Sequence, residues 1–112
     1  MRYMALRKAT AATEAGAPPA AARSRILEEA KRDGVLLVSE TLKPSRRGRR
    51  YKNSGEGVRV IDGPFTESKE LIAGYVIVEV ATLEDADRWA RRYLETVDAQ
   101  EVDLRELEDE SP

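Results

Sequence analysis

Residues 62–80 read DGPFTESKELIAGYVIVEV, a charged turn that leads directly into the most apolar strand of the chain. The first residues have the chemistry of a turn. Asp62 can accept hydrogen bonds from the backbone N–H groups that follow it. Gly63 permits a wider range of the backbone angle φ, and Pro64 fixes the direction in which the chain leaves the turn. The charged residues that follow cluster beside Asp62, so this stretch predicts a candidate site as well as a structural turn.

Alternation over residues 75–80 predicts a strand with two chemically different faces. One face carries valines at positions 76, 78 and 80, and we expect it to pack under helices. The opposite face carries Tyr75, Ile77 and Glu79. This mixed surface is more typical of a dimer interface or a pocket than of a bare sheet in solvent.

The rest of the chain completes a pattern of strand, helix, two or more strands, strand, helix, strand. This order is typical of a ferredoxin-like α+β sandwich, an antiparallel sheet with two helices on one face. The predicted elements are a strand at Tyr3–Leu6, a loop at Ala9–Ala17, a helix at Ala20–Asp33, a strand at Val35–Leu42 that begins with the buried run Val35–Val38, a hairpin of Arg49–Lys52 with Gly57–Ile61, a helix from Thr82 to Val97 and a strand at Glu101–Arg105.

Length and composition limit the classes of function. The chain has 112 residues, so we expect one domain over residues 1–107, followed by an acidic, frayed tail over residues 108–112. Its formal net charge is −2, so we expect no global attraction to nucleic acid or to a membrane. Cysteine and histidine are absent, which removes thiol chemistry and the usual general base. We expect no metal site and no cofactor. The N-terminus has no signal-like apolar core and no stretch approaches the roughly 20 apolar residues of a membrane span, which predicts a cytoplasmic protein.

The stretch Asp62–Tyr75 resembles the signature of the DGPF-domain proteins, the YCII-related family of small bacterial proteins. The resemblance covers nearly the whole chain. It continues, in order, at Met1–Met4, Lys8–Thr10, Thr13–Gly16, Gly34–Leu37, Leu42–Ser45 and Trp89–Arg92.

This resemblance implies a bacterial protein with a dimeric, ferredoxin-like α/β-barrel fold and a cleft beside the signature loop. The family largely lacks an assigned activity, and some of its members occur beside extracytoplasmic-function sigma factors. Enzyme-like members pair a histidine with an aspartate, and this chain has no histidine to supply that pair. Two segments depart from the family pattern: Pro18–Asp33 is shorter than the usual first helical region, and Ser39–Leu42 replaces a turn that bears glycine.

We favour a dimeric small-molecule-binding or regulatory module. Its dimer interface would be the sheet face that carries Tyr75, Ile77 and Glu79, called the open sheet face below, and its cleft would lie near that face. The candidate ligand-binding residues are Arg59, Asp62, Phe65, Glu67, Lys69, Glu70, Tyr75 and Glu79. Phe65 and the charged loop residues also have structural interpretations. Phe65 can be a plug over the edge of the core, and the charged side chains can be solvated loop residues.

Two other functions remain open. In an enzyme, Asp62 or Glu67 would act as the base, and Tyr75 or Arg59 would stabilise developing negative charge. In an interaction module, the basic run at residues 46–52 would contact phosphates or an acidic protein. The acidic domain makes a nucleic-acid partner the weaker expectation, and a solvated hairpin loop is the simpler interpretation of that run.

Overall fold

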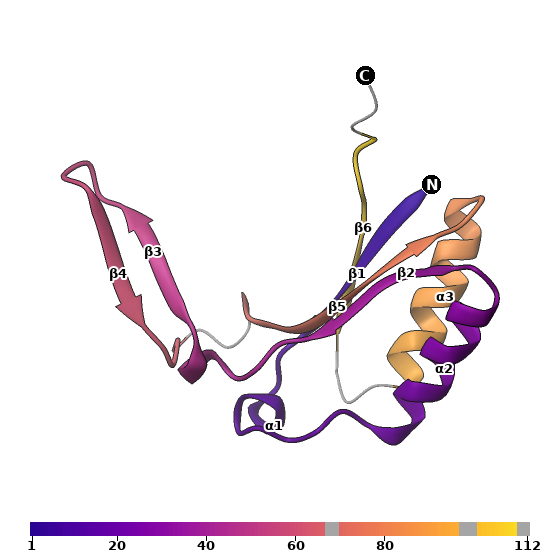
Figure 1. Ribbon diagram of the computed structural model, residues 1–112, viewed down its shortest axis with the longest axis horizontal. Coiled ribbons are helices and arrows are strands. Elements are labelled where there is room, and N and C mark those ends of the chain that lie inside the picture. The colour runs from indigo at the N-terminus through magenta and orange to yellow at the C-terminus, as the bar shows by residue number, and fades with distance from the viewer. Residues whose placement is uncertain (67–69, 97–100, 110–112) are drawn as a thin grey trace.

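The computed structural model describes residues 1–66, 70–96 and 101–109. Figure 1 shows a sheet with two helices packed on one side and a hairpin that stands apart from it. In chain order the elements are β1 (Arg2–Lys8), α1 (Ala11–Glu14), α2 (Ala21–Arg32), β2 (Leu36–Thr41), the 3-10 turn η1 (Ser45–Arg47), β3 (Arg49–Asn53), β4 (Val58–Asp62), β5 (Ile72–Glu79), α3 (Leu83–Thr96) and β6 (Val102–Glu106).

The main sheet has the strand order β2-β5-β1-β6, and its neighbouring strands are antiparallel. Ala5 at the centre of β1 lies opposite Val76 on one side and Leu104 on the other. Because α2 lies between β1 and β2 in sequence and α3 lies between β5 and β6, this is a ferredoxin-like α+β sheet. The predicted fold class is confirmed.

The core lies between the sheet and the two helices. Val76 and Val78 are fully buried there, as the alternation predicted, and Ile26, Ala86 and Tyr93 cover them. The ring of Tyr93 stacks on that of Trp89 with centroids 4.9 Å apart.

At the edge of this core, the phenol of Tyr3 donates a 3.2 Å hydrogen bond to Glu106. Burial and then this bond raise the pKa of Tyr3 above its ordinary value of 10.0.

Local signals position both long helices. Gly34 has a φ of +74°, and its N–H donates to the Lys31 carbonyl, which ends α2. At the start of α3, the Asp85 N–H donates to the Thr82 hydroxyl at 3.1 Å. Within the described part of the chain, no helix is both long and apolar enough to cross a membrane.

Two local predictions are wrong. The loop expected at Ala9–Ala17 contains α1, because Thr10 and Thr13 each bind the backbone N–H of the other, at 3.1 and 2.7 Å, and so fix a helical turn. The run Val35–Val38, expected to be buried, begins an edge strand in which Leu37 is 46% exposed and Val38 is 39% exposed. A strand of buried composition at a sheet edge leaves apolar surface open.

The predicted hairpin is confirmed, but β3 and β4 form a separate sheet away from the main one (Figure 1). Tyr51 lies opposite Val60, and every residue from Tyr51 to Val60 is exposed. This projecting arm contributes to a radius of gyration of 15.8 Å. A compact chain of this length has a radius of about 13 Å.

Candidate functional site

The turn at residues 62–66 is anchored on the segment that precedes β3. The N–H of Gly63 donates to the carbonyl of Gly48 at 3.0 Å, and the Gly63–Pro64 peptide is cis. A Cβ atom on Gly63 would lie 1.8 Å from the carbonyl oxygen of Ser45. The backbones approach so closely that only glycine fits at position 63.

Ser45 is the centre of this contact. Only 8% of the residue is exposed, and its hydroxyl donates to the carboxylate of Glu14 while it accepts a 3.1 Å hydrogen bond from the N–H of Phe65. The N–H of Ser45 donates to the other oxygen of Glu14 at 2.8 Å. These bonds join α1, η1 and the 62–66 turn into one unit. Satisfied networks of this kind rigidify the groups that they connect.

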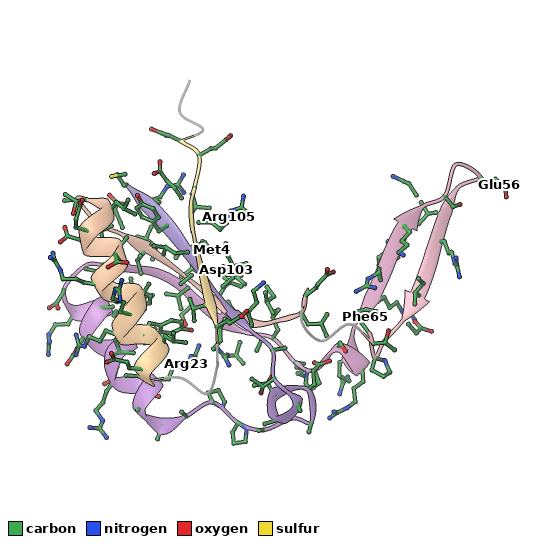
Figure 2. The ribbon with its side chains drawn as sticks, turned by 180° about the vertical axis from the view of Figure 1, so that it is seen from behind. Met4, Arg23, Glu56, Phe65, Asp103 and Arg105 are labelled. Carbon is green, nitrogen blue, oxygen red and sulfur yellow. The ribbon has the colours of Figure 1, made fainter. Side chains whose placement is uncertain are left out.

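Phe65 lies at the base of the hairpin arm, as Figure 2 shows. Its ring is half-buried, and the guanidinium of Arg50 lies 4.3 Å from the ring centroid. A cation over an aromatic face at this distance is attracted by the ring quadrupole. The ring is therefore held from one side by Arg50 and along its backbone by Ser45.

Beside Phe65 is a cleft of about 480 Å³, within the size range of small-molecule sites. Its walls are largely apolar. Glu14 and Ser45 supply polar groups within it, and the charged side chains of Lys43, Arg47 and Glu70 also line it. The remaining lining residues are Leu42, Pro44, Gly48, Phe65, Leu71 and Ile72.

Of the sequence-predicted site residues that the structure describes, Phe65 and Glu70 line this cleft and the others do not. Asp62 forms an ion pair with Arg49 at 3.1 Å, and its side chain is 78% exposed. Arg59 lies on the arm opposite Lys52. Glu67 and Lys69 lie outside the described residues.

Tyr75 and Glu79 lie on β5, on the face away from the helices. Tyr75 pairs with Leu6 of β1 and Glu40 of β2, whereas Glu79 pairs with Arg2 at the far end of the strand. Asp62 and Tyr75, two of the candidate catalytic residues, are not among the residues that line the cleft.

The basic run at residues 46–52 is divided between η1 and β3. Arg46 donates to the carbonyl of Glu14 at 3.3 Å, Arg49 pairs with Asp62, and Arg50 lies over Phe65. Three of its arginines therefore hold the loops around the cleft.

Sequence reasoning missed Glu14 and Ser45 as site residues. Both belong to segments that carry the family resemblance, but they are 31 residues apart, and no local pattern predicts that they meet. Their contact depends on α1, which the sequence had indicated as a loop.

The sequence profile of the YCII-related domain matches residues 1–103. The chain belongs to the YCII-related domain family. This membership agrees with the fold and with the anchored turn at residues 62–66. No curated protein matches the chain significantly.

Proposed function

We propose that this YCII-related domain is a small-molecule-binding module that uses the cleft beside the 62–66 turn. The observation that carries the proposal is the hydrogen-bonded unit of Glu14, Ser45 and Phe65 inside a cleft of about 480 Å³. Pre-organised polar groups in a largely apolar concavity are the usual composition of a ligand site. Because the unit is already formed, a ligand need not order these groups when it binds.

The lining residues favour a particular ligand chemistry. Glu14 accepts two hydrogen bonds from Ser45, and a carboxylate has about four lone-pair positions, so it retains capacity for a ligand. Phe65 and Ile72 offer apolar contact. We therefore expect a ligand with an apolar body and an N–H or O–H donor directed at Glu14.

We propose that the module is a homodimer. On the face of the sheet away from the helices, Ile77 lies between Met4 and Val38, and Figure 2 shows Met4, Asp103 and Arg105 on this side. The arm adds a second apolar surface, since Tyr51 and Val58 are each 64% exposed and Val60 is 49% exposed. An isolated two-stranded hairpin is marginally stable in water, so a second copy that covers the arm would stabilise it.

A thermal-shift screen of small metabolites tests the binding function, because a ligand that binds only the folded state raises the melting temperature. We expect at least one compound with an apolar body and a hydrogen-bond donor to do so. Ile72→Trp, which adds volume within the cleft, should weaken its binding at least about tenfold, since a filled cleft excludes the ligand.

The matched control is Leu83→Trp, which adds the same ring at the exposed start of α3. We expect the control to bind the compound as the parent protein does. Equal binding by the Ile72→Trp protein would show that the compound occupies another site and would refute the proposal.

A further inference from the structure

Arg7 is a buried cation that lacks a counter-charge in the described part of the chain. The residue is only 2% exposed. Its Nη2 donates a long hydrogen bond of 3.3 Å to the carbonyl of Ala73, and its Nε has no partner. Charged side chains are almost never fully buried unless they are paired, because the cost of removing a charge from water is large.

The absence of a side chain at Gly74 leaves room for this guanidinium. Arg7 lies opposite Gly74 of β5. A Cβ atom on Gly74 would lie 2.8 Å from Arg7 Nη2 and 2.7 Å from the carbonyl oxygen of Glu40, so a side chain at position 74 has no room. The position of Arg7 is therefore specified by its neighbours.

Arg7 lines a cavity of about 220 Å³, separate from the cleft but adjoining the same segment, Leu42–Pro44. A second cation, Lys43, and the polar residues Thr13 and Thr41 also line this cavity. Its other lining residues are glycine, alanine, proline and leucine, so no carboxylate is present among them. Among the described residues that line this cavity, the charged ones are therefore both cations.

We propose that this cavity is a binding site for a small oxyanion, a carboxylate or phosphate group, held by Arg7 and Lys43. The planar guanidinium binds such groups through paired N–H donors, and Lys43 adds a point charge. Thr13 and Thr41 are further polar residues at the wall. This site shares Lys43 with the wall of the proposed cleft, but Arg7 lines only this cavity and Glu14 lines only the cleft. The Arg7 variants therefore test the anion site whether or not the cleft binds a ligand.

Thermal unfolding in sodium acetate and in sodium phosphate, each compared with sodium chloride at equal ionic strength, tests the proposal. We expect the melting temperature to rise with at least one oxyanion, since binding to the folded state stabilises it. The response to each salt distinguishes a carboxylate site from a phosphate site. Arg7→Met should weaken the oxyanion binding at least about tenfold, because charge-assisted hydrogen bonds are lost.

The control is Arg32→Met, which removes an arginine whose side chain is 73% exposed at the end of α2. We expect this protein to respond as the parent does. Arg7→Lys retains the charge without the planar fork, and Lys43→Met retains Arg7, so each should show weakened binding even if Arg7→Met fails to fold. The proposal is overturned if neither oxyanion stabilises the parent beyond chloride, or if the Arg7 and Lys43 variants that fold respond like the control.

Discussion

Gly63 has no room for a side chain, because an added Cβ would lie 1.8 Å from the oxygen and 2.7 Å from the carbon of the Ser45 carbonyl. Both atoms are backbone, so a rotamer change cannot relieve the clash. We expect Gly63→Ala to lower the free energy of unfolding by about 1–3 kcal/mol or more, as overpacking does. Chemical denaturation with urea measures this loss through the transition midpoint.

Gly48→Ala provides the matched control for that substitution. Gly48 has a φ of −118°, and a Cβ there would lie 3.4 Å from the Ser45 oxygen and 3.8 Å from the Phe65 ring. This is near ordinary contact distance, and we expect a much smaller change in stability. Equal midpoints for the two variants would contradict the close approach of the 62–66 turn to Ser45.

At the scale of elements, the periodic spacing of apolar residues predicts a strand or helix correctly where one face of that element is buried. The valines of β5 and the apolar positions Ile26 and Ala30 of α2 repeat at the strand and helix periods, and the structure buries them. The positions of these elements could therefore be predicted from the sequence.

Elements whose structure depends on polar contacts or on strand order could not be predicted in the same way. The four residues of α1 form through the reciprocal bonds of Thr10 and Thr13, which produce no hydrophobic period. Leu37 and Val38 look buried by composition, but β2 occupies an edge, and strand order is a property of the whole sheet.

The candidate site was predicted only in part for the same reason. The sequence indicates the turn at residues 62–66 and includes Phe65 and Glu70 among the site residues, and both line the cleft. It does not indicate Glu14 or Ser45, because their contact needs α1 and η1 to be positioned by the fold.

At the scale of the whole molecule, the arm and the open sheet face together favour a second copy. The molecule measures 47 × 40 × 19 Å along its principal axes, and the arm projects from the main sheet (Figure 1). We expect sedimentation velocity to give a dimer. Ile77→Glu should raise the dimer dissociation constant at least about tenfold, because it places an unpaired charge in the centre of the proposed interface.

Leu83→Glu places the same charge on an exposed leucine of α3, away from the open face, and should leave the dimer intact. A parent protein that sediments as a monomer would contradict the proposed dimer. Dissociation caused equally by both substitutions would place the interface elsewhere.

Nuclear magnetic resonance titration of the parent protein with a library of small fragments tests the binding function most directly. For fragments with an apolar body and a hydrogen-bond donor, we predict that the amide signals of Ser45, Gly48, Phe65 and Ile72 shift together, because these residues share one cleft. Shifts confined to the arm or to the open sheet face, or no fragment that shifts the cleft signals, would contradict the proposal that this YCII-related domain binds small molecules beside its 62–66 turn.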